Sequence, residues 1–206
     1  MRDYIERFIS HTEQTLRSLS YHEVAKALNI LQAVFERDGR LYAFGNGGSL
    51  ALATHWVSDF NKTVFGGDVE RKQRRFQAIR VPTTEEELTA WANDVGFDTV
   101  FAGPLQNYLQ DADAVVAISA SGNSSNVVKG VELAKAHQVP VIGLSGFSPD
   151  NRLNQLADAK IHVATEPGEY AIVEATHGVV LHLMTQYFRD YFDHIVAREQ
   201  ARSGMG

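Results

Sequence analysis

The 206-residue sequence contains no cysteine. Disulfide bonds and thiolate chemistry are therefore excluded, and a bound metal would take its ligands from histidine, carboxylate or amide side chains. No apolar run approaches the length of a membrane span, and a stretch such as "VVLHLM" is far too short. The first ten residues, "MRDYIERFIS", carry charges where a signal peptide needs an apolar core. We therefore expect a cytoplasmic protein with no membrane partner.

Positive charge is also scarce, because 19 Lys and Arg stand against 25 Asp and Glu, for a formal net charge of −6. This balance argues against nucleic acid as the main ligand. A hydrophobic content of 44% and a charged content of 21% are typical of a soluble globular chain rather than a disordered one. With no linker or internal repeat, we expect one domain over residues 1–206, with helices over 1–38 and an α/β core over 39–206.

The hydrophobic pattern predicts the order of the elements. Residues 1–38 have helical spacing and form two helices, the second with a capped start. Short apolar runs then predict strands over 40–45, 76–81, 114–119, 139–145 and 160–165. Helices are predicted over 49–60, 84–92, 97–110, 124–137, 150–157 and 170–198. Apolar strands alternating with helices indicate a parallel, doubly wound sheet covered on both faces, so we expect a three-layer, flavodoxin-like sandwich.

Two loops rich in glycine and serine follow strands of this sheet. The first, "GNGGS" (45–49), lets backbone amides approach an anion, and we expect Ser49 to cap the helix after it. The second, "SASGNSSN" (119–126), offers four serines before a helix. The first lacks the final glycine of a dinucleotide loop, and the second lacks the lysine of a Walker motif. The pair predicts a site for a small phosphorylated metabolite, although a polar turn with an ordinary cap is the simpler alternative for each.

These loops, together with His55, "ANDVGFDTVF" (92–101) and "EATHGVVLH" (174–182), resemble the sugar isomerase (SIS) domain family and, within it, the phosphoheptose isomerases. The resemblance covers most of the chain. It implies a five-stranded α/β sandwich that forms a homotetramer with active sites between subunits. It also implies conversion of sedoheptulose 7-phosphate to the corresponding aldoheptose 7-phosphate without a redox cofactor.

The resemblance implies roles for individual residues. The family's phosphate-binding serines correspond to Ser49, Ser119, Ser121 and Ser124. Its sugar-binding positions correspond to Asn46, with Gly47 beside it, and to Asn93 and Asp94. Its single zinc ion per site is held by positions that correspond to His55, Asp59, Glu174 and His182. The family usually has Glu where this chain has Asp59, and Gln where it has Glu174.

Aldose–ketose isomerisation moves a proton between C1 and C2 through an enediol. We expect Asp59 to act as general base and His182 as general acid and base, with a divalent metal polarising the oxygens. His55 and Asp59 share one helix face, whereas Glu174 and His182 are about 12 Å apart along theirs. Glu174 and His182 can therefore reach one ion only if their side chains converge strongly, if the helix begins after Glu174, or if subunits share the site. His177 is an alternative ligand. We read the other histidines as structural or surface residues, and Lys62 and the basic cluster at 71–75 as minor candidates near the sugar or a neighbour's phosphate.

Other functions stay open at this point. An eight-carbon ketose phosphate would fit the same motifs, which leave the sugar's chain length, its anomer and its pathway undetermined. A different class is a non-catalytic SIS protein that binds a partner, as does the relative associated with the replication initiator. That relative lacks the final-helix histidine, which is present here as His182. A phosphosugar sensor is the third alternative.

Overall fold

The computed structural model describes the backbone of residues 1–66 and 74–203 and the side chains of these residues as far as His194. Five parallel strands form one sheet in the order β2-β1-β3-β4-β5. The strands are β1 (Arg40–Gly45), β2 (Gln77–Arg80), β3 (Ala114–Ser119), β4 (Val141–Gly146) and β5 (Ala159–Val163). The order reverses between β1 and β3, which is the switch point where ligands bind in such sheets. The predicted flavodoxin-like, doubly wound sheet is confirmed.

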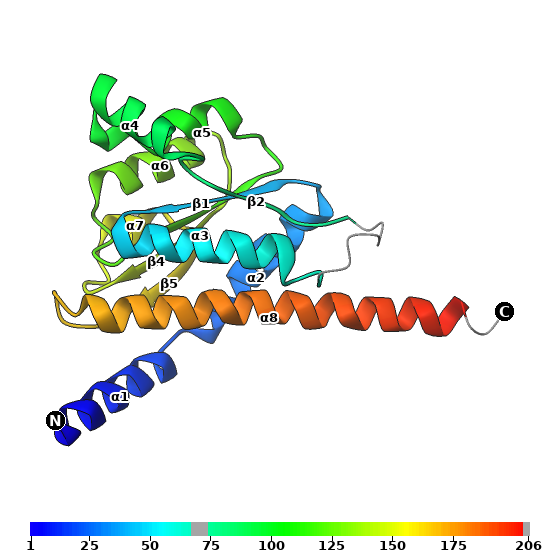
Figure 1. Cartoon of the computed structure of the whole chain (residues 1–206), viewed down its shortest axis with the longest axis horizontal. Helices are drawn as coiled ribbons and strands as arrows, with labels where there is room; N and C mark the ends of the chain where they lie inside the picture. Colours follow the sequence, from blue (N-terminus) through cyan, green and yellow to red (C-terminus); the bar gives the residue numbers. More distant parts are fainter. Residues whose placement is uncertain (67–73, 204–206) are drawn as a thin grey trace.

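Helices cover both faces of this sheet (Figure 1). One layer contains α2 (Tyr21–Glu36), α3 (Gly47–Lys62) and α8 (Tyr170–Ser203). The other contains α4 (Glu85–Asp94), α5 (Ala102–Tyr108), α6 (Ser125–Ala136) and α7 (Arg152–Leu156). Side chains alternate along each strand, so Leu41 and Ala43 enter the first core while Tyr42 and Phe44 enter the second. This arrangement is the predicted three-layer sandwich.

Prolines explain two boundaries that differ from the prediction. The expected helix over 97–110 is a 3-10 turn, η1 (Phe97–Thr99), followed by α5. Pro104 lies in the first turn of α5 and has no backbone N–H to bond the carbonyl of Val100, so the helix does not continue back into η1. The strand expected from residue 139 begins instead at Val141, directly after Pro140, which cannot donate to the sheet.

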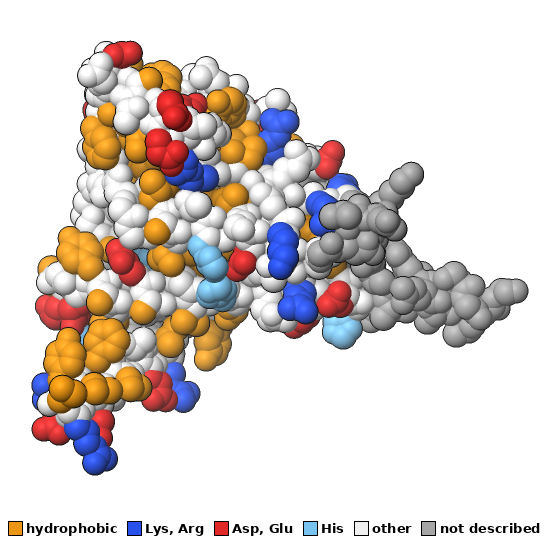
Figure 2. Space-filling model, in the orientation of Figure 1, with side chains coloured by type: hydrophobic (Ala, Val, Ile, Leu, Met, Phe, Trp, Pro, Cys, Tyr) orange, Lys and Arg blue, Asp and Glu red, His pale blue; other side chains and the backbone are white. Residues whose placement is uncertain are grey.

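Helix α1 (Arg2–Arg17) projects from the layers at an angle to α8 and contacts the start of that helix (Figure 1). Its predicted apolar face forms, but it stays uncovered in the single chain, because Ile5, Phe8 and Ile9 are 38–59% exposed. Figure 2 shows the resulting hydrophobic surface at this end of the molecule. Within the described residues, no helix combines the length and apolar character needed to cross a membrane.

Candidate active site

The two glycine- and serine-rich loops lie side by side because β1 and β3 are neighbours, with Gly45 in register with Ile118. Their side-chain amides join them: Asn46 and Asn126 each donate to the other, at 2.9 and 2.8 Å. Together with the start of α8 they enclose a pocket of about 130 Å³. It is lined by Asn46, Ser49, Ile118, Ser119, Ala120, Ser121, Ser124, Tyr170 and Glu174. All four predicted phosphate-binding serines therefore face one cavity.

The first loop turns at Gly47, whose φ of +50° is unfavourable for residues with a Cβ. Helix α3 starts there, with Asn46 at the N-cap position and no side chain capping it. The prediction that Ser49 caps the helix is wrong, because Ser49 lies inside the first turn and is 5% exposed. Uncapped N-terminal amides and their partial positive charge are well suited to hold an anion.

The second loop turns at Gly122, which has a φ of +64°. The backbone N–H of Gly122 donates to Ser119 Oγ at 3.2 Å, and Ser119 Oγ lies 3.3 Å from Ser124 Oγ. Ser124 is the N-cap residue of α6, but its hydroxyl makes no capping bond. The serine hydroxyls are thus clustered at a second helix N-terminus, so the N-termini of both α3 and α6 lie at the pocket.

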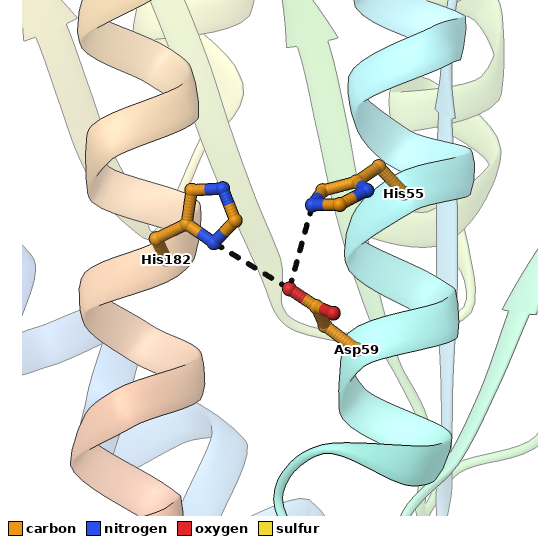
Figure 3. Close-up of side chains that lie close together, drawn as sticks. All are labelled: His55, Asp59 and His182. Carbon is orange, nitrogen blue, oxygen red and sulfur yellow. Dashed lines mark ion pairs between the residues drawn. The ribbon is translucent and has the colours of Figure 1, made fainter.

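A second group of side chains lies further along α3 and α8. His55 and Asp59 are one turn apart on α3, and His182 comes from α8 (Figure 3). Asp59 Oδ2 is 3.5 Å from His55 Nε2 and 3.4 Å from His182 Nδ1, while Asp59 Oδ1 accepts from Thr63 Oγ1 at 3.3 Å. One donor atom from each of the three residues lies within 4.8 Å of the others. Two imidazoles and one carboxylate at this spacing are suited to bind a divalent metal.

Comparison with known proteins identifies the family of this chain. The family model for the SIS domain matches residues 3–146. This chain belongs to the SIS domain family. It is 32% identical over 189 residues to the phosphoheptose isomerase of Bordetella avium, covering 88% of this chain and 93% of that protein. It is 30% identical over 192 residues to the probable phosphoheptose isomerase of Thermoplasma volcanium, covering 93% and 92%.

Among solved structures, that of phosphoheptose isomerase from Neisseria gonorrhoeae has a TM-score of 0.78 at 25% identity. The match covers 92% of this chain and 96% of that one. The resemblance seen in the motifs therefore extends to the fold, and within the SIS family this chain is of the phosphoheptose isomerase type.

Glu174 was expected to join the metal group of this SIS protein, but the structure brings together only the other three members. The Glu174 carboxylate lies in the serine pocket and against Gly48, where a Cβ would stand 2.6 Å from Glu174 Oε2. The reason is the helix rise, which separates Glu174 from His182 by two turns, or about 12 Å. Parallel packing of α3 beside α8 preserves this separation.

The alternative ligand His177 does not approach the group either. Its side chain is completely buried, and Nε2 lies 3.1 Å from the carbonyl oxygen of Ser145 on β4. Burial lowers the pKa of His177 to about 4. Of the histidines expected to be structural or on the surface, His162 is half-buried and bonded to Ser145, and His11 pairs with Glu169 at 3.4 Å. The remaining ones are exposed: His22, His137 and His194.

Asn93 and Asp94 are not brought to the pocket within one chain. They are exposed at the end of α4, in the layer opposite α3 and α8, and Asn93 donates to Asp94 at 2.7 Å. Of the basic cluster at 71–75, residues 71–73 lie outside the described residues. Arg74 donates to the Glu36 carbonyl and stacks on Phe35.

Sequence reasoning missed Tyr170, which opens α8 and lines the serine pocket. Its ring meets Phe147 edge-on, with centroids 5.0 Å apart. A lone aromatic residue at a helix start carries no local signal of binding, so only the placement of α8 reveals it.

Proposed function

We propose that this protein is an aldose–ketose isomerase that converts sedoheptulose 7-phosphate to D-glycero-D-manno-heptose 7-phosphate through an enediol. The observation that carries the proposal is the pairing of an anion pocket with a His–Asp–His group along the same two helices. The relatives named phosphoheptose isomerase support the same reaction. About 12 Å of helix separates the two parts, which accommodates an extended sugar phosphate with its phosphate at one end.

The phosphate would be held by Ser49, Ser119, Ser121 and Ser124. Their hydroxyls line the pocket, and the N-termini of α3 and α6 add backbone amides and partial positive charge. Asn46 lines the same cavity beside Gly47, whose missing side chain leaves space for the sugar. The reactive C1–C2 end would then extend along α3 and α8 toward Asp59.

Two protons move in the reaction, and the Asp59–His182 pair is suited to move both. Asp59 takes the proton from C1 while His182 gives its Nε2 proton to O2, which forms the enediol. The same Nε2 then takes the O1 proton, and Asp59 returns its proton to C2. His182 directs Nδ1 toward Asp59, which leaves Nε2 without a partner among the described residues and available for the substrate oxygens. Both groups end in their starting states, so the cycle balances.

A single zinc ion fits the donor set of His55, Asp59 and His182. Two nitrogens and one carboxylate oxygen within 4.8 Å of one another match a catalytic zinc site with one open position. A bound zinc would supply Lewis-acid polarisation of the substrate oxygens. Glu174 as a fourth ligand stays a prediction, since its carboxylate lies in the serine pocket of the single chain.

We further propose a homotetramer whose subunits share active sites. The exposed apolar face of α1 offers a surface for a second copy. Asn93 and Asp94 lie in the layer opposite the pocket, so they would reach a sugar only in a neighbouring subunit. The cytoplasmic location also stays a prediction, as does the choice between a seven-carbon and an eight-carbon substrate.

The test is direct conversion. The protein is incubated with sedoheptulose 7-phosphate and zinc, and the aldose is followed by NMR, with fructose 6-phosphate as the comparison substrate. We expect conversion of the heptose, a loss of at least about tenfold with a chelator, and recovery when zinc is restored. Absence of turnover with added zinc would refute the heptose assignment.

A further inference from the structure

His177 lies on α8 between Glu174 and His182, and its side chain bonds this helix to the sheet. The side chain is completely buried, and Nε2 lies 3.1 Å from the carbonyl oxygen of Ser145 near the end of β4. A carbonyl oxygen only accepts, so Nε2 carries the proton and donates it. One turn earlier on the helix, Val173 packs on Gly146, where a Cβ would approach within 2.7 Å of it. Successive residues of β4 thus contact successive turns of α8.

The same end of β4 supports the serine loop. Ser145 is in register with Ser119, and the N–H of Gly146 donates to the carbonyl of Ala120 at 2.8 Å. The side-chain amide of Asn151 donates to Ser145 Oγ at 3.1 Å. Beyond it, the backbone N–H of Leu153 donates to the Gly122 carbonyl at 2.9 Å, inside the loop. The end of β4 at Ser145 is therefore hydrogen-bonded to the serine loop on one side and to α8 on the other.

A small displacement of α8 would move side chains both in the serine pocket and in the group of His55, Asp59 and His182. Gly178 faces Leu52 of α3, and a Cβ built on Gly178 would be 3.5 Å from Leu52, at van der Waals distance. His182 meets His55 and Asp59 beyond this point, and Glu174 meets Gly48 before it. Between these two polar contacts, the residues that face each other are the apolar Leu52 and the small Gly178, which do not define a position along the helix axis as a buried hydrogen bond does.

We propose that His177 is a positioning residue whose bond to Ser145 fixes α8 along the sheet, holding His182 opposite His55 and Asp59 while Glu174 faces the serine loop. The proposal rests on the proposed isomerase function only where it uses isomerase kinetics as a measurement. Burial keeps the pKa of His177 near 4, so the imidazole stays neutral and the donating tautomer persists throughout the neutral range. His177 touches no reacting atom and acts through His182.

The experiment compares four substitutions at buried positions of α8. His177→Leu removes the donor, and His177→Gln restores one near the position of Nε2. His177→Asn keeps an amide but is too short to reach Ser145. Thr176→Val is the matched control, because Thr176 is equally buried but its hydroxyl donates to Ile172 within the helix. Each protein is studied below its unfolding temperature, by zinc titration calorimetry, by isomerase kinetics and by hydrogen–deuterium exchange over residues 170–184.

We expect His177→Leu and His177→Asn to lower zinc affinity and kcat by about tenfold or more, with KM changed much less. Their exchange over 170–184 should be faster than that of Thr176→Val, and His177→Gln should recover most of both losses. If His177→Asn binds zinc and exchanges hydrogen as the wild type does, the proposal is overturned. It is also overturned if His177→Gln folds but regains neither zinc affinity nor slow exchange. If His177→Leu does not fold, the comparison of Gln with Asn decides. If the wild type lacks isomerase activity, the proposed function fails, while exchange and zinc affinity still test His177.

Discussion

At the scale of single residues, the two carboxylates of the site stand in different surroundings. Both oxygens of Asp59 are engaged, one by two imidazoles and the other by Thr63. Glu174 makes no hydrogen bond or ion pair with any of the described residues and faces the serine pocket. Asp59 is therefore the carboxylate whose loss disturbs the histidine pair directly.

We expect Asp59→Asn and His182→Ala each to lower kcat by about a hundredfold or more, since each removes a group that transfers a proton. Asp190→Asn is the control: it makes the same chemical change on exposed α8, where Asp190 accepts only from Gln186. Steady-state kinetics will measure kcat of each variant, and circular dichroism will show whether each variant is folded. Normal rates in either active-site variant would remove that residue from the mechanism.

At the scale of elements, each loop depends on a glycine with positive φ, but the two differ in their surroundings. Nothing lies within 4 Å of a Cβ built on Gly47. A Cβ on Gly122 would collide with the Asn151 side chain, which donates to Ser145 Oγ and to the carbonyl of Ser148. The turn of the second loop is therefore packed against its support, whereas the turn of the first loop at Gly47 is open.

This difference gives a prediction for stability. Gly47→Ala should cost about 1–2 kcal/mol of unfolding free energy, which is the strain of a left-handed conformation alone. Gly122→Ala should cost at least about 3 kcal/mol, because the collision with Asn151 adds to the same strain. Urea denaturation of both variants will compare them. Equal costs would show that Asn151 moves aside without loss.

At the scale of the whole molecule, α1 leaves apolar side chains uncovered that a single chain does not bury. We expect the wild type to be a tetramer by light scattering, and Phe8→Asp or Ile9→Arg to lower the mass by disrupting this surface. Arg2→Ala, on the same helix but paired only with exposed Glu6, should leave the mass unchanged. A tetramer that survives both apolar substitutions would place the interface elsewhere.

The stability of the whole chain should also depend on pH through His177. Its pKa is about 4 when folded and about 6.5 when unfolded, so below pH 6.5 the unfolded chain binds a proton that the native chain does not. Stability is therefore complete above pH 6.5 and declines toward pH 4, by about 3 kcal/mol from this residue. His162, whose pKa burial also lowers, acts in the same direction. Denaturation at pH 7 and pH 5 should show a smaller decline in His177→Gln.

Much of the fold was predictable because its signals are local. Short apolar runs predicted all five strands, and the chemistry of the two loops predicted where ligands collect. The serines converge because parallel strands bring their carboxyl ends to one edge. Only details set by individual residues differed, such as the helix interruption before Pro104 and the place of Ser49 inside the first turn of α3.

The sequence by itself thus determined the sandwich, the serine pocket and the pairing of His55 with Asp59, since each follows from periodicity or from neighbours in the chain. The family resemblance placed His182 with this pair, and the structure brings the three together. Only the tertiary structure decided that Glu174 enters the serine pocket and that His177 is bonded to β4. These outcomes depend on how α8 is placed against α3 and the sheet. That placement arises from packing between segments far apart in the chain, which no local pattern encodes.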